Sequence, residues 1–444
     1  MDSYKGQPFG CLFCVCGVSY GHRRVFRMPI IESLLDQDFY AWTVCQVAFL
    51  KGHGNVPVTY KFTNRTKDVK LGEIIDLGRL REEIQHVRSL RPSIEEVEFL
   101  RDTGYFTDDF LRFFAYDMRL CEPEVWVGDD GQLRITIEDR WQDAIFWEVL
   151  LLAIVNELYA GEMVRQRIDG TRASDLLRHG DEAMRRLKRK VEILETRPQL
   201  GLMEFGSRRR FSRQHQQDVL EYLLENIPHQ VTGTSNVRLA KLFSIKPTGT
   251  QSHQAGMAYS GIYDVSDVSM RNSQGYFFRD WWDTYRGPLS IFLTDTFTSD
   301  FFFRTFSKEE AIRSWGLRQD SGDPFAFGTR AIRFYEEMGI DPRRKMIVFS
   351  DGLNVEKMVF LWDTFSGRIG VGFGWGTNLS FDTGYSPDDS IRPLSIVIKL
   401  VESNGKPVVK LSDNIQKAIG DPAAIQRAMR VFGSNGRTDQ DVVY

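Results

Sequence analysis

Arginine and aspartate side chains follow a short apolar run in the second half of the sequence, where they could bind or stabilise charged groups. The segment LRQDSGDP holds Arg318 and Asp320 at alternate positions, so both side chains can face the same side of a strand. The arginine suits a phosphate or a carboxylate. The aspartate could bind a ribose hydroxyl, bind Mg²⁺ or balance a cationic reacting centre. A purely structural ion pair between the two residues is the alternative.

A histidine in the segment KPTGTQSHQAG is a second candidate for chemistry. His253 follows a short apolar run, and histidine can act as a nucleophile, a general base or a metal ligand. Because no second histidine or cysteine stands nearby at ligand spacing, metal binding is disfavoured. The hydroxyl groups of Thr248, Thr250 and Ser252 favour an anion-binding or nucleophilic role over a structural one.

Two further loops combine groups that suit a flat or phosphorylated anion. In GFGWGTN, glycines that include Gly376 precede Thr377; glycine lets backbone N–H groups approach an anion, and the hydroxyl adds a donor. A simple tight turn is the alternative. In EFGSRRRFS, Phe205 stands beside Arg208, Arg209 and Arg210, so it could stack on a ring while an arginine holds the charge of that ring. A packing phenylalanine beside a solvated basic loop would give the same pattern.

A repeat of strand, loop and helix must position these residues. Asp295, Asp320, Asp351 and Gly376 end successive apolar runs at spacings of 25, 31 and 25 residues, with helical patterns between them. Such units predict parallel strands joined by crossover helices. The strands could close into an α/β barrel, whose mouth would collect the aspartates, or form an open doubly wound sheet. Each aspartate alone could instead be a helix N-cap.

A second, antiparallel unit is predicted from alternating runs near residues 56–65 and 124–138, with a DDG turn, and from a late hairpin that turns at an NG pair. We expect these strands to share a separate sheet. A helix is expected from near Pro29 through Lys51. The predicted organisation is a flexible extension (1–27), an N-terminal sheet and helix domain (28–140) joined by 385–444, and an α/β barrel domain (141–384).

Composition excludes several classes of protein. The chain has 444 residues, 42% of them hydrophobic, and 57 basic against 60 acidic residues give a net charge of −3. These values exclude a disordered chain, a collagen-like fibre and a generally cationic nucleic-acid binder. The apolar run from Val149 to Val155 is too short to span a membrane and predicts a core helix.

The cysteines and the first 27 residues bear on location. Five unevenly spread cysteines argue against a secreted disulfide framework, so we expect a soluble intracellular protein. Residues 1–27 read as a flexible extension or as the product of a start upstream of the natural one at Met28. Cys11, Cys14 and Cys16 with His22 could form a metal site, but zinc sites normally show two spaced ligand pairs. The arginines of residues 1–27 leave an organelle-targeting role open for this segment.

Eight segments, in order, resemble those of the nicotinate phosphoribosyltransferase family: LLDQDFY, EFGSRRRFS, VTGTSN, GTQSH, LRQDSGDP, FSDGLN, GWGTN and NGKPVVKLSDN. The resemblance covers the chain from about Met28 onward. It implies an irregular α/β barrel with a second, smaller α+β sheet-containing domain, in a cytoplasmic homodimer with composite active sites. It also implies transfer of phosphoribosyl from phosphoribosyl pyrophosphate to nicotinate, with Mg²⁺, giving nicotinate mononucleotide and pyrophosphate in NAD salvage. ATP hydrolysis would be coupled through phosphorylated His253.

The resemblance also implies residue roles, with no metal ion held directly by the protein. The aromatic ring of Tyr40 would reach the pyridine from the neighbouring subunit, and Phe205 would cover the other face. The matching positions are His253 and Asp320 for catalysis; Tyr40, Phe205, Arg208, Ser235, Thr250 and Arg318 for nicotinate; and Arg65, Asp351, Gly376 and Thr377 for phosphoribosyl pyrophosphate.

Three positions bear on how far the resemblance extends. Related nicotinamide-using enzymes carry an aspartate at the position of Ser235, where it would accept from an amide and repel a carboxylate, so serine favours the acid. Gln254 stands where many relatives have glutamate, and Gln319 stands where histidine is frequent. Both could alter the ATP or phosphate step.

Two alternative functions remain open at this point. Quinolinate phosphoribosyltransferase has a similar fold and product, but it decarboxylates a diacid, needs more basic residues in its pocket and uses no ATP. A non-catalytic binding protein could also retain the barrel. The joint presence of His253, Arg318 and Asp320 argues against lost activity.

Overall fold

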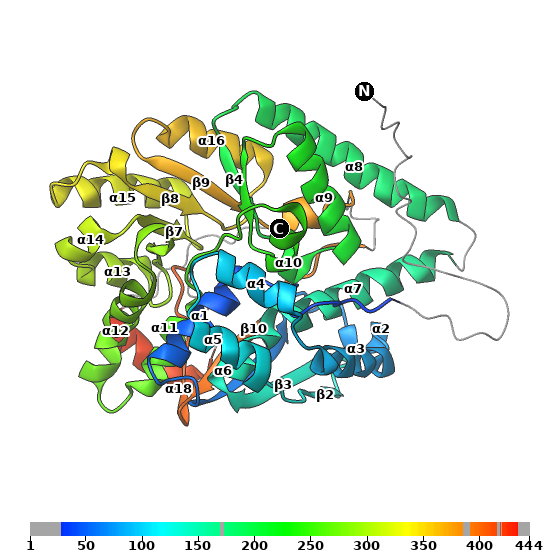
Figure 1. The fold of residues 1–444 in the computed structure, drawn as a ribbon, viewed down its shortest axis with the longest axis horizontal. Helices are drawn as coiled ribbons and strands as arrows, with labels where there is room; N and C mark the ends of the chain where they lie inside the picture. Colours follow the sequence, from blue (N-terminus) through cyan, green and yellow to red (C-terminus); the bar gives the residue numbers. More distant parts are fainter. Residues whose placement is uncertain (1–27, 169–172, 385–390, 415–417, 419, 434–444) are drawn as a thin grey trace.

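The computed structural model describes residues 28–168, 173–384, 391–414, 418 and 420–433. Two sheets organise these residues, a parallel one in the upper half of Figure 1 and an antiparallel one in the lower half. Residues 1–27, and with them the predicted extension and its cysteine and histidine set, lie outside the described residues.

The strands are β1 (Pro57–Asn64), β2 (Glu124–Val127), β3 (Leu133–Arg140), β4 (Gly201–Glu204), β5 (Val231–Thr234), β6 (Ile291–Leu293), β7 (Gly316–Gln319), β8 (Met346–Phe349), β9 (Gly370–Trp375), β10 (Ile396–Ser403) and β11 (Lys406–Pro407). The α-helices are α1 (Phe39–Leu50), α2 (Leu71–Ile74), α3 (Leu77–Ser89), α4 (Ile94–Asp102), α5 (Asp108–Arg112), α6 (Trp141–Ala144), α7 (Trp147–Ile168), α8 (Ala173–Glu195), α9 (Arg213–Asn226), α10 (Val237–Phe243), α11 (His253–Ile262), α12 (Asp267–Tyr285), α13 (Ser299–Thr305), α14 (Lys308–Arg313), α15 (Pro324–Glu337), α16 (Val355–Phe365), α17 (Thr377–Ser380) and α18 (Pro422–Phe432).

The parallel sheet has the order β5-β4-β9-β8-β7-β6, and every neighbouring pair runs parallel. The strands predicted from the repeat therefore lie side by side, as β6, β7, β8 and β9. Every residue of β6 and β7 is buried, as expected for parallel strands whose two faces are both covered. Helices α15 and α16 flank β8 and β9 (Figure 1).

A loop, rather than a ladder of strands, fills the space between the edge strands β5 and β6. On one side Pro247 forms a parallel bridge with Thr234 of β5, and the Thr248 N–H donates to the Thr234 carbonyl at 2.8 Å. On the other side the Leu293 N–H of β6 donates to the Gln251 side chain at 3.1 Å. This partial closure makes an irregular barrel, as expected, and explains why sequence periodicity alone left an open sheet possible.

The second sheet is antiparallel with the order β11-β10-β1-β3-β2. Buried residues alternate along β1, because one face of that sheet covers the core. The NG hairpin is present between β10 and β11: Asn404 and Gly405 have φ values of 55° and 70°, as a two-residue hairpin turn requires. The predicted sharing of one sheet by distant segments is therefore seen, while the residue bounds of the domains stay predictions.

Helix α1 begins later than the sequence pattern predicts. It begins at Phe39 rather than near Pro29. Residues just before it bind the segment after β5 instead: Asp38 bridges to Asn236, and the Phe39 N–H donates to the Ser235 carbonyl at 2.7 Å. The expected early start was wrong because this tertiary pairing competes with helix formation.

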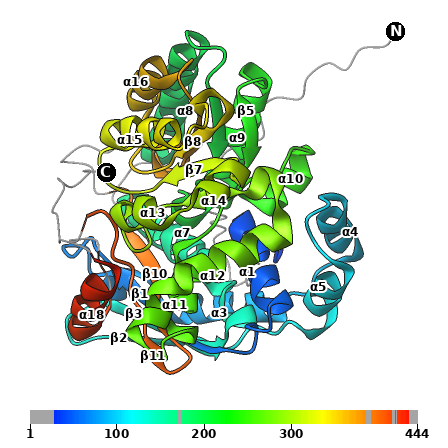
Figure 2. The same cartoon turned by 90° about the vertical axis from the view of Figure 1, so that its left-hand side faces the viewer.

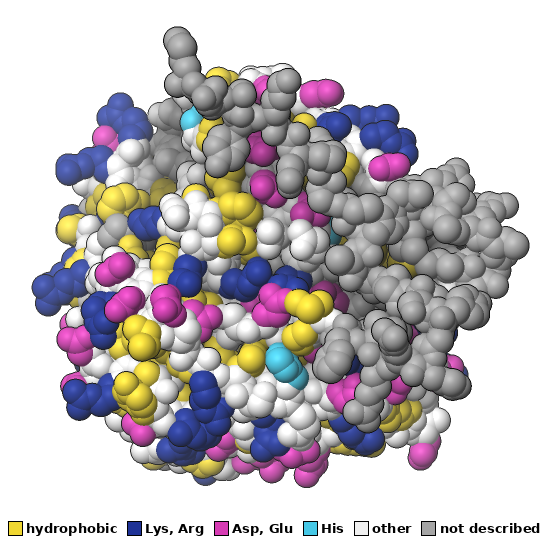
Figure 3. All heavy atoms as spheres, turned by 45° about the vertical axis from the view of Figure 1, so that its right-hand side comes forward, with side chains coloured by type: hydrophobic (Ala, Val, Ile, Leu, Met, Phe, Trp, Pro, Cys, Tyr) yellow, Lys and Arg dark blue, Asp and Glu magenta, His cyan; other side chains and the backbone are white. Residues whose placement is uncertain are grey.

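A long, apolar helical stretch of the chain is buried inside the molecule. The stretch Trp141–Arg165 is long and apolar enough to cross a membrane, but 83% of its most apolar window is buried inside the molecule, as in a core helix. On the face drawn in Figure 3, basic and acidic side chains are interspersed among the described residues.

A buried arginine connects the start of the chain to the barrel. The Arg210 guanidinium is fully buried and donates to both carboxylate oxygens of Asp36, at 2.7 and 3.0 Å, and to Glu157 of α7 at 2.7 Å. Burial opposes the charge, but the two carboxylates outweigh it and raise the pKa of Arg210 above its ordinary value. This network fixes the loop that carries Arg208.

We predict that Arg210→Met lowers the free energy of unfolding by about 3 kcal/mol or more, because it leaves Asp36 and Glu157 as buried, unpaired carboxylates. Urea unfolding measures the loss. The control is Arg343→Met, which breaks an exposed pair with Asp341 and should cost less than about 1 kcal/mol. Equal losses in the two variants would contradict the prediction.

Candidate functional site

The aspartates at the carboxyl edge of the parallel sheet are not helix caps. Asp295, Asp320 and Asp351 each precede the residue that caps the following helix. The caps are Thr298 for α13, Asp323 for α15 and Asn354 for α16, and each accepts a backbone N–H with its side chain. The alternative interpretation as N-caps is therefore wrong, and the carboxylates are left for other partners.

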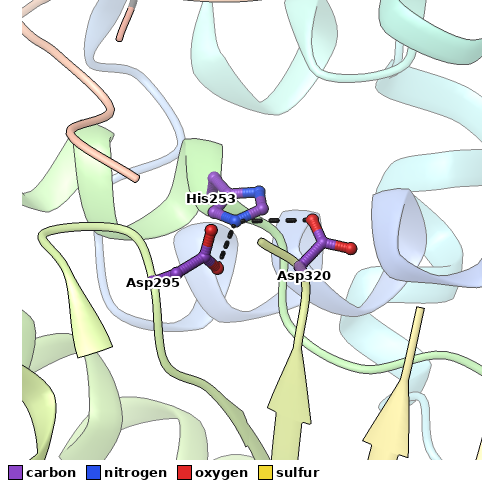
Figure 4. A group of neighbouring side chains, drawn as sticks. All are labelled: His253, Asp295 and Asp320. Carbon is purple, nitrogen blue, oxygen red and sulfur yellow. Dashed lines mark hydrogen bonds and ion pairs between the residues drawn. The ribbon is translucent and has the colours of Figure 1, made fainter. Parts of the chain in front are cut away.

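Two of these aspartates meet the histidine (Figure 4). His253 is the first residue of α11, and its Nε2 atom lies 2.8 Å from Oδ1 of Asp295 and 3.5 Å from Oδ2 of Asp320. The three side chains come from α11 and from the loops after β6 and β7. The Asp295 side chain is fully buried, and the His253 side chain is 10% exposed. An imidazole held by a buried carboxylate has a fixed orientation and tautomer.

Arg318 joins this group to the neighbouring loops. Its guanidinium donates to Asp320 at 2.8 Å, to the Thr250 hydroxyl at 3.0 Å and to the Ser350 hydroxyl at 2.9 Å. The predicted structural ion pair with Asp320 thus exists, but within a larger set of site residues. Ser350 precedes Asp351, which is itself buried at the end of β8.

The charged side chains around His253 shift one another's pKa values. Burial opposes ionisation of Asp320, but the charges of Arg318 and then His253 outweigh it and hold the pKa of Asp320 below its usual range. Burial, together with the charge of Lys410, lowers the pKa of His253 to about 4, although Asp295 favours the charged form. At neutral pH the imidazole is therefore uncharged and keeps a lone pair on one ring nitrogen.

The histidine and the two aspartates lie close enough together to be considered as a metal site. Asp295, however, already binds the Lys410 ammonium at 3.0 Å and the Ser321 hydroxyl at 2.6 Å, besides His253. A cation held there would compete with the ammonium group that neutralises Asp295. The donor set fits a resident metal ion poorly, and we assign none to it.

A second group surrounds Arg208. Its Nε atom lies 3.3 Å from Oδ2 of Asp38, and its guanidinium lies over the Tyr40 ring of the same chain at 5.9 Å. The Ser235 hydroxyl donates to Oδ1 of Asp38 at 2.7 Å. A carboxylate is therefore present beside Ser235 after all, but Arg208 balances its charge. Because Tyr40 meets Arg208 within one chain, supply of this ring by a neighbouring subunit stays a prediction.

Glu148 of α7 connects the two groups. Its carboxylate accepts from the Tyr40 hydroxyl and from the Gln254 amide, both at 2.9 Å, and lies 3.7 Å from Arg208. Gln254 also accepts from the Tyr60 hydroxyl. With glutamine at this position, Glu148 receives a donor instead of facing a second carboxylate. Gln319 is likewise structural, since its amide donates to two carbonyls of the loop after β7.

Phe205 packs against the end of β9, so the segment GFGWGTN, predicted as a loop, is strand as far as Trp375. A Cβ atom built on Gly374 would lie 2.5 Å from the Phe205 ring, so the ring packs directly on that glycine. The Arg318 guanidinium lies 6.0 Å from the centre of the same ring. Gly376 follows β9 and lies against the Phe205 carbonyl, and Thr377 begins α17.

Arg65 follows β1, where its backbone N–H donates to the Ser395 carbonyl. Its charge, with those of Arg208 and Lys410, acts on Lys399 of β10. Burial is the largest cause that lowers the pKa of Lys399 to about 8, while Glu148 opposes the shift. Several cations of the antiparallel sheet and the C-terminal segment thus lie near the site.

Sequence reasoning missed several residues of this site. Asp295 was expected at the mouth but was given no role, and Asp38, Glu148, Lys410 and Gln254 were not proposed as site residues. Asp38 lies inside the segment LLDQDFY, and Glu148 is the acidic residue before an apolar helical run, so each carried a weak signal. Their partners are distant in sequence, which periodicity cannot show.

Comparisons with known proteins identify the family that this chain resembles. Residues 200–436 match the nicotinate phosphoribosyltransferase (NAPRTase) family, and residues 35–156 match the NAPRTase N-terminal domain. A nicotinate phosphoribosyltransferase structure from Vibrio cholerae is 35% identical, with a TM-score of 0.81, and the match covers 93% of this chain and 95% of that one. One from Porphyromonas gingivalis is 30% identical, with a TM-score of 0.79 and coverages of 91% and 100%. A putative one from Saccharomyces cerevisiae is 27% identical, with a TM-score of 0.78 and coverages of 91% and 99%.

We predict that Gly374→Ala lowers the free energy of unfolding by about 1–3 kcal/mol, because the new methyl group must displace the Phe205 ring. Gly372→Ala is the control, since its methyl group would first meet the flexible end of Met346 at 3.3 Å. Urea unfolding compares the two. A Gly374→Ala protein as stable as Gly372→Ala would show that Phe205 does not pack as described.

Proposed function

Because this chain belongs to the nicotinate phosphoribosyltransferase family, we propose that it makes nicotinate mononucleotide and couples the transfer to ATP through a phosphorylated His253. The observation that carries the ATP-coupled step is the His253 imidazole at the start of α11, which Asp295 holds beside Asp320 and Arg318. The remaining paragraphs derive what each group would do.

His253 is suited to accept a phosphoryl group. When Nε2–H donates to Asp295, the lone pair stands on Nδ1, the ring nitrogen that makes neither of the two contacts drawn in Figure 4. Nδ1 attacks the γ-phosphorus of ATP, the new N–P bond forms, and the bond to the leaving ADP oxygen breaks. The buried hydroxyls of Thr248 and Ser252 have no partner among the described residues and offer donors to a phosphate.

Asp320 is suited to the transfer step. When pyrophosphate leaves the anomeric carbon, positive charge develops on the ribose, and a carboxylate that stays ionised stabilises it. Arg318 keeps Asp320 ionised and oriented. Arg65, Asp351, Gly376 and Thr377 are proposed to bind phosphoribosyl pyrophosphate, which brings Mg²⁺ with it as its counter-ion.

The nicotinate pocket is proposed between Phe205 and Tyr40, with Arg208, Ser235, Thr250 and Arg318 around it. Phe205 offers a flat face that Gly374 supports. The acid group would meet arginine charge, provided that the carboxylate of Asp38 stays compensated by Arg208 and the Ser235 hydroxyl. The Ser235 hydroxyl thus donates a hydrogen bond that stabilises the Asp38 carboxylate, and serine adds no further charge to the pocket.

Assembly and location follow from the same proposal. We propose a homodimer with composite sites, in which a second copy adds groups to the mouth that one chain already forms. We also propose a cytoplasmic enzyme of the ligase class. The free thiols of Cys45 and Cys121 suit a reducing compartment.

The test of the ATP step is His253→Ala. We expect the ATP-dependent increase in nicotinate mononucleotide formation to fall at least about tenfold, while the melting temperature stays close to that of the wild type. His215→Gln is the control, because His215 is a buried histidine on α9 that contacts neither Asp295 nor Asp320. Retained ATP stimulation in His253→Ala would refute the role. Product from quinolinate with release of carbon dioxide would instead favour the alternative enzyme.

The test of acid selectivity is Ser235→Asp. A carboxylate at this position would face Asp38 and any bound acid, so kcat/KM for nicotinate should fall about 100-fold, equivalent to about 2.7 kcal/mol. Ser235→Ala removes only the hydrogen bond to Asp38 and should cost less than about tenfold. Steady-state kinetics with nicotinate and with nicotinamide measure both variants. Similar losses in the two would argue that charge at this position does not select the substrate.

A further inference from the structure

The segment NGKPVVKLSDN has so far contributed only Lys410 to the site, and its second half crosses the loop that carries Asp295. We call residues 408–414 the strap. The Leu411 N–H donates to the Thr296 carbonyl at 2.9 Å, and the Lys410 ammonium lies 3.0 Å from Asp295. The Asp413 carboxylate accepts from the N–H and the hydroxyl of Ser299, both at 2.6 Å. The strap therefore binds Asp295 and Thr296 near the start of this loop and Ser299 where the loop passes into α13.

The loop after β6 needs such support. Thr298 has a backbone φ of 84°, in a region that residues other than glycine rarely adopt. A backbone in this region persists only where the surroundings over-determine it. Thr298 lies between Asp295, which holds His253, and Ser299, which Asp413 binds. The conformation that presents Asp295 to His253 thus depends on contacts outside the loop.

Apolar contacts of the same loop also go to the C-terminal part of the chain. Phe297 stacks on Phe432 of α18, with ring centres 3.8 Å apart and planes 7° apart. The two rings belong to a small core cluster, separate from the main one, that includes Val409 and Leu411 of the strap. Helix α18 contacts α12, and Figure 2 shows it at the side of the molecule. The loop is therefore anchored on the C-terminal segment.

The Ser321 hydroxyl links the Asp295 carboxylate to the backbone of Asp413. Ser321 donates to Oδ2 of Asp295 at 2.6 Å and accepts from the Asp413 N–H at 3.2 Å. Burial and then the charge of Asp295 raise the pKa of Asp413 to about 6, while Ser299 and Lys410 oppose the shift. Asp413 is thus held near Asp295 at an electrostatic cost, which its two bonds to Ser299 offset.

We propose that the strap positions Asp295, with Asp413 as the positioning residue, so that Asp295 fixes His253 in the Nε2–H tautomer. The inference rests on the proposed role of His253 in using ATP. Asp413 touches neither His253 nor any substrate position named above. It acts through Ser299 and the strained turn at Thr298, so a change at residue 413 alters the imidazole and leaves the nicotinate pocket in place.

The test measures the imidazole directly. In full-length protein labelled with ¹⁵N-histidine, the two ring nitrogens of His253 are assigned by comparison with His253→Gln. The wild type should show one protonated and one unprotonated nitrogen. In Asp413→Ala the two signals should move toward each other, because the proton is no longer held on Nε2 by Asp295. In parallel, ATP-dependent kcat should fall at least about tenfold, while KM for nicotinate stays within about twofold.

Two further variants make the outcome decisive. Asp413→Asn keeps one acceptor for the Ser299 N–H and should give an intermediate change; it also carries the test if Asp413→Ala does not fold. Glu402→Ala is the matched control, since it removes an exposed carboxylate of β10, whose backbone there pairs with β1 and β11 rather than with the loop. Unchanged His253 signals in folded Asp413 variants would overturn the proposal. If the signals change but the wild type shows no ATP stimulation, the positioning stands and the proposed use of ATP fails.

Discussion

The Arg318 guanidinium holds three segments together at the carboxyl edge of the parallel sheet, and the rest of the site depends on it. One nitrogen binds Thr250 of the loop that fills the gap beside β6, another binds Asp320 after β7, and the third binds Ser350 after β8. A buried arginine is stable only when its donors and its charge are matched. The same bonds that satisfy Arg318 keep Asp320 ionised and place His253, two residues beyond Gln251, between two aspartates.

Charge compensation extends from this centre in two directions. Lys410 neutralises Asp295 from the C-terminal side, and Arg208 faces Asp38 and Glu148 from the other. In each case a carboxylate that would be costly to bury alone has a cation and at least one hydroxyl or amide donor. The charged groups of the site are thus fixed in place before a substrate binds, so they need no reorientation to interact with it.

The sequence predicted the repeating strands and their polar ends well, because a parallel strand and its crossover helix are local patterns. Asp320 and Arg318 could be placed together for the same reason. The filling of the barrel gap by Pro247 and Gln251 could not be predicted, since it depends on two strands that are distant in the chain. Glu148 shows the same limit: its position on a core helix was visible, but its three partners lie on separate segments.

The small apolar cluster around Phe297 and Phe432 has a consequence for how the molecule is made. Its strap and its helix α18 follow every strand of the parallel sheet in the chain, so the ribosome produces them after the barrel strands. A nascent chain can form the sheet and bury most of its core while the loop of Asp295 still lacks its anchor. The histidine and its aspartate therefore come into register only after the strap and α18 have been made.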